Sequence, residues 1–131
     1  MASAPAFAAT PVCWSGLVPA TADTSLTAPS NVTTLGTGGA SGSKIEEIVC
    51  QGVGTTVAGV VNIFLYDSST YHLFDFFIIP AYTSSATVGA WRASRQYQNL
   101  VLPSNSWSLR CTVTIAGDQS LVKVTATGAS F

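Results

Sequence analysis

The stretch 59–80 is the most hydrophobic and aromatic part of the chain, and its pattern predicts two strands. Alternation of large side chains places these strands at 58–66 and 71–79, with the polar link DSST at 67–70 as a four-residue hairpin turn. Both strands carry large apolar groups on both faces, whereas a strand covered on one side only would alternate cleanly. We therefore expect one face of the hairpin to be domain core, and the other to be covered by the N-terminal arm or by a neighbouring subunit.

Further strands are predicted on either side of this hairpin. The pattern favours strands at 44–53, 106–116 and 121–126, and two short strands, or one strand and a loop, within 87–102. No segment after residue 43 favours a helix. Six or seven strands at this spacing predict an all-β fold, an antiparallel β-sandwich of the jelly-roll or immunoglobulin-like kind, as one domain over residues 44–131.

Glu46 and Glu47 are the only adjacent carboxylates in the chain. Neighbouring residues of a regular strand point to opposite faces, so these two would not share one cavity unless a bulge intervened. The same rule places Ile45 and Ile48 on opposite faces. Because acid–base catalysis by two carboxylates needs both to face one cavity, the pair does not predict an active site.

Residues 1–43 differ from the rest of the chain. Four prolines recur in a background of Ala, Ser and Thr, which leaves no room for a helix of useful length. We expect an extended N-terminal arm with edge strands at 11–17 and 32–35, while residues 1–10 fit a docked segment and a disordered tail equally well. The arm is too apolar to be a solvated linker, and its candidate partner-binding residues are Phe7, Val12, Trp14 and Leu17.

Charge is scarce, and this changes the picture of the surface. Charged residues make up 8% of the chain, against roughly 25% in an ordinary soluble domain, and the net charge is −1. A weakly charged exterior suits a protein packed against copies of itself or against a larger assembly. The five basic residues are too few and too scattered to hold a nucleic acid, although Arg92 and Arg95 are close enough to contact a partner.

The chain contains no apolar run near the ~20 residues of a membrane span, so we expect no membrane partner. Its first residues lack the basic and apolar regions of a signal peptide, which favours synthesis in a cytoplasm. The single histidine, His72, has no second ligand at a workable spacing, and no nucleophile elbow accompanies it. We expect no enzymatic activity, no metal and no cofactor.

Cys13, Cys50 and Cys111 are an odd set, and their spacing matches no zinc or redox motif. Two interpretations stay open. The three are small buried hydrophobic residues, or they form an inter-chain disulfide that locks an assembly.

The part of the chain from about residue 42 to residue 131 resembles a family of small structural proteins of tailed bacteriophages. The likeness lies in KIEEI at 44–48, GTTVAGVV at 54–61, FLYD at 64–67, YHLFD at 71–75, NLVLP at 99–103 and WSL at 107–109. These segments are strands and turns without chemistry. The resemblance implies a non-enzymatic virion protein, made in the host bacterial cytoplasm, and in particular a capsid decoration (cement) protein that binds the major capsid protein or other virion proteins as a homo-oligomer.

Two alternatives remain at this point. One is a tail, neck or fibre component of the same kind of particle. The other is a carbohydrate-binding β-sandwich module, whose stacking platforms would be Trp14, Trp91 and Trp107 together with Tyr71, Tyr82 and Tyr97.

Overall fold

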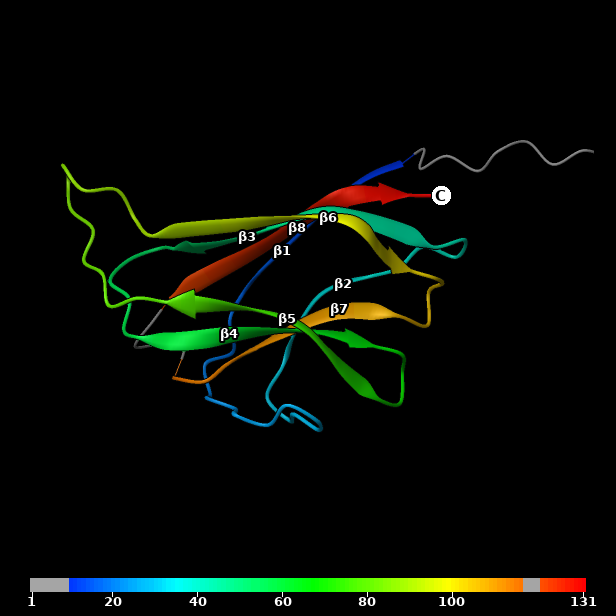
Figure 1. The fold of residues 1–131 in the computed structure, drawn as a ribbon, viewed down its shortest axis with the longest axis horizontal. Helices are drawn as coiled ribbons and strands as arrows, with labels where there is room; N and C mark the ends of the chain where they lie inside the picture. Colours follow the sequence, from blue (N-terminus) through cyan, green and yellow to red (C-terminus); the bar gives the residue numbers. More distant parts are fainter. Residues whose placement is uncertain (1–9, 117–120) are drawn as a thin grey trace, which may run out of the picture.

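The computed structural model describes residues 10–116 and 121–131, and within these ranges every regular element is a strand. The strands are β1 (Thr10–Leu17), β2 (Thr33–Thr37), β3 (Ser43–Gly52), β4 (Gly59–Tyr66), β5 (Tyr71–Ile79), β6 (Arg92–Leu102), β7 (Ser108–Val113) and β8 (Val122–Ser130). They form two four-stranded antiparallel sheets that lie face to face as two layers (Figure 1). Sheet I has the order β1-β8-β3-β6, and sheet II has the order β2-β7-β4-β5.

This strand order confirms the predicted antiparallel β-sandwich and identifies which kind it is. Strands far apart in the chain are neighbours in both sheets: β1 pairs with β8, and β2 pairs with β7. Eight strands arranged as two interlocked Greek keys make a jelly roll, so the immunoglobulin-like alternative does not hold.

The predicted elements are confirmed at most positions. The hairpin of 59–80 is β4 and β5. The stretch 87–102 is a loop followed by one long strand, β6, as one of the two alternatives had it. The two short strands of the arm are β1 and β2, and each is an edge strand, β1 of sheet I and β2 of sheet II. Residues 1–9, with Phe7, lie outside the described residues.

The core lies between the two sheets. Its members are aliphatic residues, two cysteines and one phenylalanine: Val18, Leu35, Ile45, Ile48, Cys50, Val61, Ile63, Phe77, Ile79, Leu100, Leu102, Leu109, Cys111, Val113, Val122, Val124 and Ala126. All of these are buried, and most have no exposed surface at all. Burial of this set, at about 25 cal/mol per Å² of apolar surface, is the main force that holds the layers together.

A β-bulge in β3 overturns the predicted facing of its side chains. The register of β3 against β8 shifts between Ile45 and Glu47, so that one residue is added to β3. Ile45 and Ile48 are consequently both buried on the inner face, and Glu46 and Glu47 both come to the outside. The expectation that neighbouring carboxylates would point to opposite faces was wrong because it assumed a regular strand.

The outer face of the hairpin is covered on β4 but not on β5. Asn62 of β4 and Thr112 of β7 face away from the core, yet both are buried. The loop 18–32 lies on this side of sheet II (Figure 1), and the Asp23 amide donates to the Val113 carbonyl at 2.9 Å. The arm therefore covers part of the outer face, as expected, but the described arm leaves β5 bare.

We predict that Gly128→Ala is severely destabilising, because a Cβ at this position would lie 1.9 Å from the Lys44 carbonyl oxygen and 2.9 Å from the Ile45 Cα. Both neighbours are backbone atoms of the bulged strand and cannot rotate away. The expected loss in the free energy of unfolding is about 3 kcal/mol, measured by urea denaturation.

Gly54→Ala is the matched control, because a Cβ there meets nothing within 4 Å. The control should change stability by less than about 0.5 kcal/mol. Equal stability of the two variants would contradict the close approach of β8 to β3 at Gly128.

Candidate functional site

The largest exposed apolar feature of sheet II runs along its edge strand β5. Leu73, Phe74, Phe76 and Ile78 are 44%, 40%, 50% and 67% exposed. We call these four residues the apolar strip. Since a large apolar side chain offers about 200 Å², they expose on the order of 400 Å² together. Soluble monomers rarely expose more than a patch of this size, and such patches commonly mark an interaction site.

The register of β5 against β4 explains how the apolar strip arises. Phe76 pairs with Asn62 and Ile78 with Val60, which places both on the outer face. Phe77 and Ile79, which alternate with them along the strand, are buried in the core. A second bulge lies at Phe74, because the pairing passes from Asp75 to Leu73 across consecutive residues of β4. The centroids of the Phe74 and Tyr97 rings lie 5.3 Å apart. Because Tyr97 belongs to β6 of the other sheet, the apolar strip extends from the outer face of sheet II to the edge of the sandwich.

A polar cluster closes the gap between the two sheets beside this strip. The Tyr97 hydroxyl of β6 donates to the Asp75 carboxylate of β5 at 2.6 Å, and the Arg95 guanidinium pairs with the same carboxylate. Arg95 also donates to the Phe76 carbonyl and lies over the Phe77 ring at 5.0 Å. We call Asp75, Arg95 and Tyr97 the edge clasp, since it bonds the edge strand of one sheet to that of the other.

The edge clasp changes the acidity of its members. Burial of Asp75 opposes ionisation, but the hydrogen bonds from Tyr97, Arg95 and the Phe76 amide together outweigh burial and lower the pKa of this carboxyl. Burial, followed by the bond to Asp75, raises the pKa of the Tyr97 hydroxyl. Asp75 is therefore a carboxylate and Tyr97 a phenol near neutral pH, which is the pairing that the hydrogen bond requires.

The hairpin end holds the one histidine of the chain. His72 Nε2 lies 3.0 Å from Asp67 Oδ2, and its ring stacks on Trp107. The bond to His72, with bonds from the Thr70 and Ser69 amides, lowers the pKa of Asp67. The Ser69 hydroxyl donates to Asp67 rather than to the imidazole, so the arrangement caps the turn and does not form a nucleophile–base pair.

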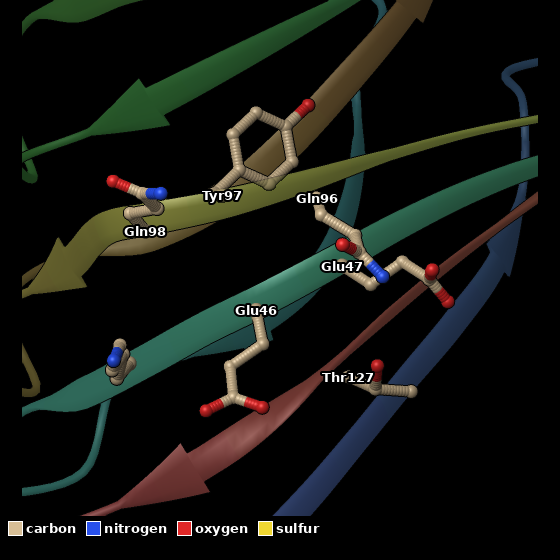
Figure 2. Close-up of a pocket in the computed structure, with 7 residues that line it drawn as sticks. Glu46, Glu47, Gln96, Tyr97, Gln98 and Thr127 are labelled. Carbon is tan, nitrogen blue, oxygen red and sulfur yellow. The ribbon is translucent and has the colours of Figure 1, made fainter.

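A shallow depression of about 660 Å³ lies on the outer face of sheet I (Figure 2). Its lining residues are Lys44, Glu46, Glu47, Gln96, Tyr97, Gln98 and Thr127. Figure 2 shows that β3 contributes the two glutamates, between the glutamines of β6 and Thr127 of β8. The bulge thus brings together the two carboxylates that a regular strand would have separated. The lining is polar and open, unlike the mostly apolar pockets that hold small ligands.

The described residues contain no group of three or more His, Cys, Asp or Glu side chains that could hold a metal ion. Within 10–116 and 121–131, no helix has the length and apolar character needed to cross a membrane.

Of the partner-binding residues expected from the sequence, the five that the structure describes do not form one surface. Val12 and Trp14 are half-buried against the core, while Leu17 on the same strand is 49% exposed. Arg92 and Arg95 belong to β6, at the edge of sheet I opposite to β1. Arg92 is exposed there, and Arg95 is held by the edge clasp. The signal for the apolar strip was present in the sequence as a hairpin with two apolar faces, although the sequence did not indicate which strand would stay bare.

The cysteines separate into two kinds. Cys13 is exposed on β1, whereas Cys50 and Cys111 are buried in the core as free thiols. Burial raises the pKa of the Cys50 thiol, with a further contribution from nearby Cys111, and raises that of Cys111 to about 12. Cys50 and Cys111 therefore cannot join two folded chains, and an inter-chain disulfide remains open only to Cys13.

The three tryptophans do not form a common platform for a sugar. Trp14, Trp91 and Trp107 are each half-buried against the core, and they come from β1, from the loop before β6 and from the turn before β7. Comparison of the chain with protein-family models and with curated proteins finds no match.

We predict that one thiol of the folded protein reacts with iodoacetamide, and that all three react in denaturant. Cys13 is open to solvent, whereas Cys50 and Cys111 are buried and hold their protons. Intact mass spectrometry counts the adducts. A Cys13→Ser variant should give none in the native state, and rapid labelling of two or more thiols in the folded wild type would contradict the burial.

We predict that Asp75→Asn lowers the free energy of unfolding by about 1 kcal/mol at pH 7, since Arg95 loses its partner but is half exposed to water. The folded-state pKa of Asp75 lies below its ordinary value of 3.8. Its stabilisation is thus complete above that value and is lost as pH falls through the folded pKa.

The gap in stability between wild type and Asp75→Asn should therefore shrink between about pH 5 and pH 2, as followed by denaturation at a series of pH values. Glu46→Gln removes an exposed carboxylate and serves as the control. A gap that stays constant across this range would show that the carboxylate charge of Asp75 contributes nothing.

Proposed function

We propose that this chain is a non-enzymatic structural protein of a multi-subunit particle, a capsid decoration protein of the tailed-phage kind that its sequence resembles. It attaches to the shell through the apolar strip of β5. The single observation that carries the proposal is this strip, because the described residues leave four large apolar side chains on one edge strand without cover.

The neutral surface supports the same proposal. Eleven residues carry a formal charge in a chain of 131, so few charges need to lose water when the surface is covered by a partner. Several of these charges are already bonded within the domain, as Asp75 and Arg95 are in the edge clasp. Burial of an uncharged apolar strip is favourable without charge pairing, which suits attachment to a large and repetitive surface.

The jelly-roll order adds support by analogy of fold. Jelly rolls occur in viral capsid proteins and also in lectins, so the fold alone does not separate the two roles. The tryptophans favour the capsid role, because a lectin-like site needs an open stacking surface and all three tryptophans are packed against the core. A tail, neck or fibre component would use the same strip on a different part of the particle.

The proposal predicts that Ile78→Glu abolishes attachment while the fold stays intact. Ile78 is 67% exposed, so a charge there costs little in the free protein but would have to be desolvated in the complex. Co-sedimentation with expanded capsids, assembled from the major capsid protein of the same genome, should show at least a tenfold loss of binding with an unchanged Tm.

Val101→Glu is the matched control, because Val101 is 40% exposed on β6 of the other sheet. It should bind like wild type. The proposal is wrong if the wild type does not co-sediment with the capsids, or if Ile78→Glu binds as well as Val101→Glu.

A further inference from the structure

Two open sheets have four edge strands, and three of them are protected against pairing with another chain. β2 has five residues and a register shift between Thr34 and Gly36. β5 has its bulge and the inward carboxylate of Asp75, and β6 carries Arg92 and Arg95. Short length, bulges and charges are the usual devices that prevent edge-to-edge association.

β1 has none of these devices except one proline near its start. It pairs with β8 over all eight residues without a register shift, and its sequence TPVCWSGL contains no charge. A long, regular and uncharged edge strand is a template for strand addition.

The register shows which backbone groups of β1 face outward. The Val18 amide donates to the Val122 carbonyl at 3.0 Å, so even-numbered residues of this strand bond to β8. In an antiparallel ladder the alternate residues point the other way. The outward groups therefore belong to Pro11, Cys13, Ser15 and Leu17.

At two of these outward positions, one backbone group is missing or already hydrogen-bonded. Pro11 has no N–H to donate, and the Leu17 carbonyl accepts a hydrogen bond from the Thr33 hydroxyl at 2.8 Å. No other described strand bonds to the remaining groups, which are the N–H and C=O of Cys13 and Ser15, the Pro11 carbonyl and the Leu17 amide.

We propose that β1 pairs with β1 of a second copy of this chain, antiparallel about a twofold axis, with Trp14 opposite Trp14. In this register Cys13 lies opposite Ser15 of the second copy, and Pro11 lies opposite Leu17. Cys13 and Ser15 exchange four hydrogen bonds over the two copies, and the Leu17 amides donate to the two Pro11 carbonyls. Pro11 has no N–H to donate to the Leu17 carbonyl opposite it, but that carbonyl already accepts a hydrogen bond from the Thr33 hydroxyl, so it is not left unpaired.

Neighbouring symmetric registers leave groups without partners. With Cys13 opposite Cys13, the missing donor of Pro11 falls on the Ser15 carbonyl, which has no other partner. With Ser15 opposite Ser15, Cys13 falls opposite Leu17, and its amide meets a carbonyl that Thr33 already occupies. The self-complementary fit favours a second copy over a foreign strand. Because β1 carries no charge, two copies of it also meet without like-charge repulsion.

The first test compares two variants of the full chain by sedimentation velocity over a range of concentrations. Ser15→Pro removes an outward N–H and leaves the β8 ladder complete, whereas Ser15→Ala keeps that N–H. Both lose the bond between the Ser15 and Thr125 hydroxyls. Wild type and Ser15→Ala should be dimers, and Ser15→Pro should be a folded monomer by circular dichroism.

The second test fixes the register and does not depend on a proline. Ser15→Cys places a thiol opposite the native Cys13 of the second copy, at a Cα separation of about 5.5 Å that suits a disulfide. Oxidised glutathione should then convert the protein to a covalent dimer on a non-reducing gel. Wild type, whose Cys13 residues lie diagonally at about 7–8 Å, and Ser15→Cys with Cys13→Ser should not cross-link.

A monomeric wild type at all concentrations would overturn the proposal, as would equal association of Ser15→Pro and Ser15→Ala. Cross-linking of wild type but not of Ser15→Cys would overturn the register. If Ser15→Pro does not fold, the cross-linking result decides alone. The capsid-binding test uses the opposite side of the sandwich, so failure there leaves this dimer unaffected.

Discussion

The close approach of the β8 backbone to β3 at the bulge is the contact on which sheet I depends. Gly128 lies so near the Lys44 carbonyl that no side chain fits between them. Because β3 pairs with both β8 and β6, the bulge shifts its register against both neighbouring strands. The bulge puts Ile45 and Ile48 together in the core, and it creates the polar depression as a consequence rather than as a built site.

Several of the few charges of the chain are held by contacts within the domain. The Asp23 carboxylate accepts hydrogen bonds from the Ser25, Ser30 and Asn31 amides, which hold the loop 18–32 in shape and lower the pKa of that carboxyl. Arg110 lies over the Tyr66 ring at 4.1 Å. With Asp67 in the hairpin turn and Asp75 in the edge clasp, these charges organise loops and edges, whereas Lys44, Glu46 and Glu47 lie on the outer face of sheet I.

Much of the fold followed from local patterns, but its pairing did not. The hairpin of β4 and β5 was predictable because its partners are adjacent in the chain and joined by a polar turn. The sheet order was not predictable, since β1 pairs Ser15 with Thr125, 110 residues away. The bulge was not predictable either, because it depends on Gly128, which is distant in sequence and reads locally as an ordinary glycine.

The candidate site was predictable only in part, for a related reason. The two apolar faces of the hairpin indicated a surface that needs cover. The position of β5 at a sheet edge, beyond the reach of the loop that covers β4, decided which residues remain exposed. The burial of Cys50 and Cys111 likewise follows from where β3 and β7 lie, in the middle of their sheets.

The two proposed surfaces lie on opposite edges of the sandwich, and this arrangement compensates for the small area of the apolar strip. The apolar strip offers on the order of 400 Å², about half of what one partner contributes to a stable interface. A dimer through β1 would make one continuous eight-stranded sheet, with the strips near its two ends, on the order of 30 Å apart. Two weak contacts on one rigid body bind a repetitive lattice far more tightly than either contact alone, provided that the lattice spacing matches. Pairing at one edge would thus make a small strip at the other edge sufficient for attachment.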